Sequence, residues 1–138
     1  MEQTQPSKLK YIGAWFLAAF AGNILIKIVD SILANAMVND VSDLNTYFVV
    51  GAAVSIPIVS GSFIFIYNLF KSLNIKKVMI YLYVLTPLGT FFNFGLTYPV
   101  YRSMGVDLTV YFWVAIITPI AALYLIRSYY IKRPDRWF

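Results

Sequence analysis

Three polar residues lie at helical spacing in an otherwise apolar stretch near the start of the chain. Asn23, Lys27 and Asp30 are four and three residues apart, so a helix places them along one face. A charged side chain inside a bilayer is costly and usually faces protein or water, as an ion, proton or anionic-headgroup site does. The alternative is a Lys27–Asp30 pair that satisfies itself near the outer interface, because Lys27 lies ~25 Å along the helix from Tyr11. The sequence leaves both interpretations open.

A second polar stripe occurs in a later apolar stretch. Thr86, Thr90, Asn93 and Thr97 also repeat at helical spacing, and Pro87 lies beside the first of them. Because proline frees the carbonyl one turn back, this face could line a path for a small polar solute. The competing interpretation is favoured, namely that these groups hydrogen-bond between neighbouring helices at ~0.6 kcal/mol each.

Prolines and small residues indicate how the helices bend and pack. Pro57, Pro87 and Pro119 each fall in the middle third of an apolar stretch and are expected to kink it. Prolines at similar depth recur where helices bend around a substrate, but they are also frequent in membrane helices without that role. A stripe of small residues allows close helix approach, either within the chain or between copies: Ala14, Ala18 and Gly22.

The composition of the whole chain is that of a membrane domain. Of its 138 residues, 60% are hydrophobic and 12% are charged, which is about half the charge of a soluble domain. Short connections predict a single domain over residues 1–138, an antiparallel four-helix bundle in which sequential helices are neighbours. The stretches expected to span the bilayer as helices are about residues 11–38, 47–70, 78–101 and 108–131, between short tails at 1–10 and 132–138.

The basic residues predict the orientation. Nine lysines and arginines fall on one side, whereas the other carries only Arg102 with three aspartates. The positive-inside rule therefore places both termini in the cytoplasm, and short loops without an organelle-targeting signal favour a bacterial inner membrane. Seven of these nine residues, all but Lys8 and Lys10, are expected to contact the anionic cytoplasmic leaflet: Lys71, Lys76, Lys77, Arg127, Lys132, Arg133 and Arg136.

The residue inventory excludes several kinds of site. The chain has no cysteine and no histidine, which removes disulfides, thiolate nucleophiles, zinc sites and haem axial histidines. The only glutamate, Glu2, lies in the amino-terminal tail, and Asp30 is the sole acidic residue within an apolar stretch. We therefore expect no enzyme activity, no metal and no cofactor. Because the positive charges gather at helix ends, we also expect no nucleic-acid partner.

Two functions remain open. One is a transport or permeation unit for a small polar or lipid-linked solute. It would be a homo-oligomer, since four helices leave little room for a guarded path. The other is a non-catalytic accessory or assembly subunit of a larger membrane complex, in which the polar stripes pack against another membrane protein and the basic tail docks it. The coincidence of prolines and polar stripes favours transport.

Overall fold

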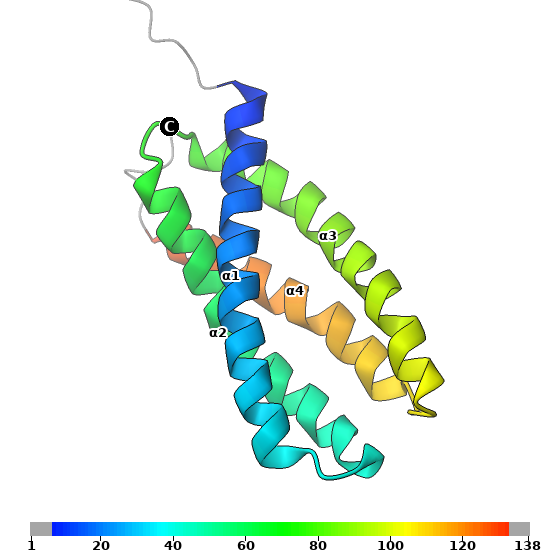
Figure 1. Cartoon of the computed structure of the whole chain (residues 1–138). Coiled ribbons are helices and arrows are strands. Elements are labelled where there is room, and N and C mark those ends of the chain that lie inside the picture. Colours follow the sequence, from blue (N-terminus) through cyan, green and yellow to red (C-terminus); the bar gives the residue numbers. More distant parts are fainter. Residues whose placement is uncertain (1–6, 133–138) are drawn as a thin grey trace, which may run out of the picture.

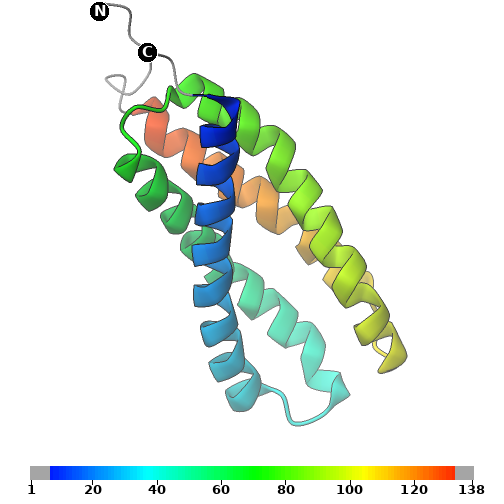
Figure 2. The same ribbon diagram turned by 45° about the horizontal axis from the view of Figure 1, so that its top comes forward.

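The computed structural model describes residues 7–132, and these form an all-helical bundle (Figure 1). Successive helices run in opposite directions, so both ends of the described chain lie at the same end of the bundle (Figure 2). Each of the four helices is long and apolar enough to cross a bilayer. They are α1 at Lys8–Met37, α2 at Leu44–Leu69, α3 at Ile75–Ser103 and α4 at Thr109–Ile131, with a short 3-10 turn, η1, at Val41–Asp43.

Three helices begin earlier than the apolar stretches that predict them: at residue 8 rather than 11, at 44 rather than 47, and at 75 rather than 78. The reason is that helical hydrogen bonding continues through charged and polar residues, at which an apolar stretch ends. In α3, the Asn74 side chain accepts hydrogen bonds from the backbone N–H groups of Lys76, at 2.9 Å, and Lys77, at 3.4 Å. Both lysines therefore lie in the first turn of the helix.

The helices do not pack in chain order. The well-packed pairs are α1–α2, α2–α4, α3–α4 and α1–α3, so the order around the bundle is α2, α1, α3, α4. The expectation that sequential helices are neighbours is therefore wrong for α2 and α3, which lie across the bundle from each other. Their connection, residues 70–74, crosses that diagonal. It buries Leu73, which is 0% exposed like Ile75 at the start of α3, and so forms part of the core.

The core is concentrated in one half of the bundle. We call this half the basic end, because it holds the described chain ends, the α2–α3 connection and only lysine or arginine among its described charges. The opposite half, the acidic end, carries the α1–α2 and α3–α4 connections with Asp40, Asp43 and Asp107 beside Arg102. The buried cluster lies at the basic end and consists of Tyr11, Ala14, Trp15, Ala18, Phe63, Ile66, Tyr67, Leu73, Ile75, Val78, Met79, Leu82, Ile126 and Tyr130.

The small residues of α1 permit its close contact with α2. Ala14, Ala18 and Gly22 are all buried. A Cβ atom added at Gly22 would lie 3.5 Å from both Cβ and Oγ of Ser62 in α2. The sequence leaves open whether this stripe of small residues packs within the chain or between copies. At Gly22 it packs within the chain.

The contact between α1 and α3 is confined to the basic end. The rings of Tyr11 and Tyr81 stack with their centroids 5.3 Å apart, and Trp15 Nε1 donates a hydrogen bond to Thr86 Oγ1 at 3.1 Å. A Cβ at Gly89 would lie only 2.9 Å from Cη2 of Trp15, so the indole can occupy this position only because residue 89 has no side chain. Beyond this point the two helices diverge toward the acidic end (Figures 1 and 2).

Candidate functional site

Asp30 lies in the half of α1 nearer the acidic end and faces α2. Its Oδ1 atom is 3.6 Å from the position that a Cβ would take on Gly51, so the carboxylate lies against α2 at a residue that has no side chain. Asp30 is half-buried. It is close enough to Tyr47 of α2 and Tyr101 of α3 to interact electrostatically with both hydroxyl groups. Three helices thus contribute to a carboxylate site made of Asp30, Tyr47, Gly51 and Tyr101.

An aromatic cluster holds Tyr101 in place. Phe48 of α2 meets Tyr101 edge-on with ring centroids 5.0 Å apart, and it lies 5.0 Å from Tyr111 of α4. Phe94 stacks on Tyr111 at 5.4 Å, and the hydroxyl groups of Thr97 and Tyr111 are hydrogen-bonded. These contacts join α2, α3 and α4 at the acidic end, so the position of Tyr101 is set by packing rather than by its own helix alone.

The other two residues of the α1 stripe, Asn23 and Lys27, are exposed. Lys27 forms no ion pair with Asp30, so the self-satisfied pair considered from the sequence is not the arrangement in this structure. Within residues 7–132, neither Asn23 nor Lys27 makes a side-chain hydrogen bond. Of the three, Asp30 alone is turned toward the neighbouring helices.

The α3 stripe divides into two kinds of residue. Thr86 accepts the hydrogen bond of Trp15, and Thr97 bonds to Tyr111 and also donates to the carbonyl oxygen of Asn93 at 3.0 Å. These two threonines link helices, as the packing interpretation predicts. Thr90 and Asn93 lie between these two threonines along α3, and their side chains make no hydrogen bond to any described residue.

The two stripes are not joined to each other. Among the residues that the structure describes, no hydrogen bond or ion pair connects Asn23, Lys27 or Asp30 with any member of the α3 stripe. The sequence does not predict the electrostatic interaction of Asp30 with Tyr47 and Tyr101. Spacing along one helix reports which residues share a face, but it does not report which residues of another helix that face meets.

The prolines that the sequence singles out lie inside continuous helices. Pro57 is in α2, Pro87 in α3 and Pro119 in α4, and each helix continues through its proline. Pro99, near the end of α3, is a further internal proline. Each of these residues lacks the N–H that would bond to the carbonyl four residues earlier, so backbone oxygens are freed at several depths of the bundle.

The residues expected to meet an anionic surface gather at the basic end. Lys71 belongs to the α2–α3 connection, and Lys76 and Lys77 to the first turn of α3. Arg127 lies near the end of α4, and Lys132 directly follows the last residue of that helix. All five are exposed. Arg133 and Arg136 lie outside the described residues.

An asparagine that sequence reasoning missed links α2 to α4 at this end. Asn68 Nδ2 donates to the hydroxyl oxygen of Tyr129 at 3.1 Å, and the hydroxyl of Tyr130 donates to Asn68 Oδ1 at 3.1 Å. The signal that could have found it is an isolated amide near the end of an apolar stretch, since such groups usually bond across helices.

The carboxylate site has limited chemical capacity. A half-buried carboxylate within electrostatic range of two tyrosines can hold a proton or a single cation, and membrane carboxylates of this kind mark proton relays and ion paths. Within residues 7–132, no three acidic side chains lie together in a way that could hold a metal ion.

In comparisons with protein-family models, with curated proteins and with solved structures, none matches this chain. Its function is therefore inferred from the residues of the bundle itself.

Proposed function

We propose that the chain is an integral membrane protein of a bacterial inner membrane, with both termini in the cytoplasm. Four helices that are long and apolar enough to span a bilayer support insertion. Large apolar side chains, such as Phe20, Phe91 and Phe92, are exposed along them, and lipid is the natural cover for such side chains. The concentration of lysine and arginine at the basic end supports the orientation.

We further propose that the protein is a homo-oligomeric transport unit for a small polar or lipid-linked solute, with proton movement at Asp30. The observation that carries this proposal is the position of Asp30, half-buried against Gly51 of α2, within electrostatic range of Tyr47 and Tyr101, and not paired with Lys27. A carboxylate with a structural ion pair would be fully occupied in holding the fold. Without one, Asp30 is able to take up and release a proton.

Polar side chains on the outer surface of the bundle support an oligomer. Asn23 and Lys27 of α1 and Asn93 of α3 are exposed on helices that are otherwise apolar. A lysine that faces lipid within a membrane helix is costly, and polar residues in membranes usually face protein or water. A second copy of the chain, or a water-filled path between copies, would cover these groups.

The alternative is an accessory subunit of a larger membrane complex. It is favoured by Thr86 and Thr97, because both hydrogen-bond to other helices and so act in packing. Under this alternative a different membrane protein covers Lys27 and Asn93. Native mass spectrometry of the protein extracted from its own membrane separates the two functions. A homo-oligomer alone supports the transport unit, and a stoichiometric complex with another protein supports the subunit.

The transport proposal is tested by proton flux into liposomes that contain the purified protein and a trapped pH-sensitive dye. Wild-type protein is expected to dissipate an imposed pH gradient, and Asp30→Asn to slow this to the rate of protein-free liposomes. The control is Asp107→Asn, which removes the same charge from an exposed connection. Its amide oxygen can still accept the hydrogen bonds that Asp107 receives from Thr109. Wild-type flux in the Asp30 variant would contradict the proposal.

A further inference from the structure

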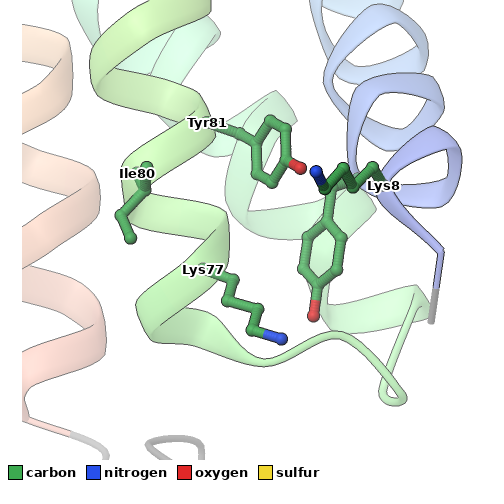
Figure 3. A pocket seen from close by; sticks show the side chains of 5 residues that line it. Lys8, Lys77, Ile80 and Tyr81 are labelled. Carbon is green, nitrogen blue, oxygen red and sulfur yellow. The ribbon is translucent and has the colours of Figure 1, made fainter. Parts of the chain in front are cut away.

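Aromatic rings gather at both ends of the bundle, but they are arranged differently at the two ends. At the basic end, Tyr11 and Tyr81 are stacked with an angle of 6° between their ring planes, so each ring covers one face of the other. Figure 3 shows the side chains of Lys8 and Lys77 beside Tyr81. The stacked rings at the basic end therefore lie among lysine side chains.

At the acidic end, the two tyrosines within electrostatic range of Asp30 keep their ring faces free of other rings. Tyr47 contacts Phe48 with the ring planes inclined at 50°. Tyr101 meets Phe48 at 78° and Tyr111 at 58°. Among residues 7–132, no ring is stacked in parallel on Tyr47 or Tyr101, and both side chains are partly exposed. The face of an aromatic ring is the part that attracts a cation.

Asp30 adds a negative charge that no described residue neutralises. Within residues 7–132, its side chain forms no hydrogen bond and no ion pair. Lys27 of its own helix and Arg102 at the end of α3 are both exposed, and neither pairs with it. The carboxylate lies against Gly51, and Tyr47 precedes Gly51 by four residues on the same face of α2. An unpaired carboxylate thus lies about one helical turn from an aromatic side chain.

This combination fits an organic cation better than a metal ion. Small metal cations such as Ca²⁺ and Mg²⁺ are held by about six or more oxygen ligands, and within residues 7–132 no three acidic side chains lie together. An organic ammonium ion needs one opposite charge, and its apolar groups pack against aromatic rings. In addition, α1 and α3, which carry Asp30 and Tyr101, diverge toward this end (Figures 1 and 2), so a ligand between these side chains would break no contact between the two helices.

We propose that Asp30 binds an organic ammonium cation, with the positive charge at the carboxylate and the apolar groups against the ring faces of Tyr47 and Tyr101. The proposal rests on the transport function proposed above and names the class of its solute. One carboxylate cannot carry a proton and pair with a cation at the same time. Binding of the cation to protonated Asp30 therefore releases one proton to water.

The test is equilibrium dialysis of radiolabelled choline against the full-length protein in a maltoside detergent. The reference compound is the uncharged analogue in which a carbon atom replaces the choline nitrogen. Asp30→Asn is expected to weaken choline binding about tenfold or more, because the cation loses its opposite charge in a partly buried site. The matched control, Asp107→Asn, removes the same charge from an exposed connection and is expected to change binding less than about twofold.

The tyrosine variants separate the ring face from the hydroxyl group. Tyr101→Phe keeps the ring and is expected to change choline binding less than about twofold, whereas Tyr101→Leu is expected to weaken it about fivefold. Tyr47→Phe and Tyr47→Leu are expected to differ in the same direction.

Three results would overturn the proposal. Equal losses in the phenylalanine and leucine variants would mean that the hydroxyl group contacts the ligand. Equal losses in Asp30→Asn and Asp107→Asn would mean diffuse attraction to the acidic end. Equal binding of choline and its uncharged analogue would mean that the protein recognises only an apolar group.

A second measurement uses only the wild-type chain, so it does not depend on how the variants fold. A hydrophobic carbodiimide that modifies carboxyl groups is applied, and the modified residues are identified by mass spectrometry. Choline is expected to slow modification of Asp30 and to leave that of Asp107 unchanged, and equal modification of Asp30 with and without choline would contradict the proposal. Proton flux that depends on Asp30, without protection by choline, would refute the organic cation alone. Protection by choline without proton flux would refute the transport unit and leave the binding site intact.

Discussion

At the basic end, side chains from all four helices and from the α2–α3 connection meet in one buried cluster. At the acidic end, Leu44 and Phe48 are buried, and the contacts that join α2, α3 and α4 there are largely between aromatic rings. The side chains of Lys27 and Asn93, which make no hydrogen bond to a described residue, lie away from the buried cluster. The comparison teaches that the basic end buries the core shared by all four helices, whereas the acidic end is joined mainly through aromatic rings and holds the half-buried carboxylate of Asp30.

The largest expected effect comes from a cavity at the basic end. Leu82 is 0% exposed, whereas Leu96, on the same helix nearer the acidic end, is 60% exposed. Leu82→Ala is expected to lower the free energy of unfolding by about 2–5 kcal/mol, because the lost contacts leave a void. Leu96→Ala is expected to change it by about 0.5 kcal/mol or less. Unfolding in mixed micelles, followed by circular dichroism, measures both, and equal losses would remove the distinction between the two halves.

A smaller effect is expected where α1 and α3 last touch. Gly89→Ala brings a methyl group to 2.9 Å from the buried Trp15 ring and is expected to cost about 1–3 kcal/mol through overpacking. The control is Gly95→Ala in the same helix, where a Cβ meets nothing within 4 Å. The same unfolding assay measures both variants. If Gly89→Ala is as stable as Gly95→Ala, the close contact is not what joins the two helices.

The smallest effect is a pH dependence confined to the acidic end. Hydrogen bonds from the side chain and backbone of Ser42 hold the pKa of Asp40 below its usual value of 3.8. A lowered pKa in the folded state means that this contribution to stability is complete above pH 3.8 and is lost as the pH falls through the folded-state pKa. Amide hydrogen exchange in residues 39–44 should therefore rise at acidic pH, before exchange in the buried cluster. Asp40→Asn should abolish that rise, and an unchanged rise in this variant would assign it to another group.

The sequence predicts the helices well and their contacts poorly. Apolar length alone identifies four helices, because the number of residues needed to span a bilayer is set by its thickness. The neighbours of Asp30 and the fit of Trp15 against Gly89 depend on which helices are adjacent, and short connections suggest the wrong adjacency for α2 and α3. The orientation in a membrane, the oligomeric state and the role of Asp30 remain predictions.

Residues 70–74 cross the basic end of the bundle from α2 to α3, and this crossing affects the order in which the helices can pack during synthesis. The two main partners of α2 are α1, which precedes it, and α4, which is synthesised after α3. Until α4 emerges, Asn68 lacks the groups that it bonds in the bundle, which are the hydroxyls of Tyr129 and Tyr130. Ser60 also bonds to the backbone of Ala122, but it has a hydrogen bond to the carbonyl oxygen of Ile56 in its own helix. A nascent chain without α4 therefore leaves the Asn68 amide uncovered on α2, and α4 closes the four-helix arrangement.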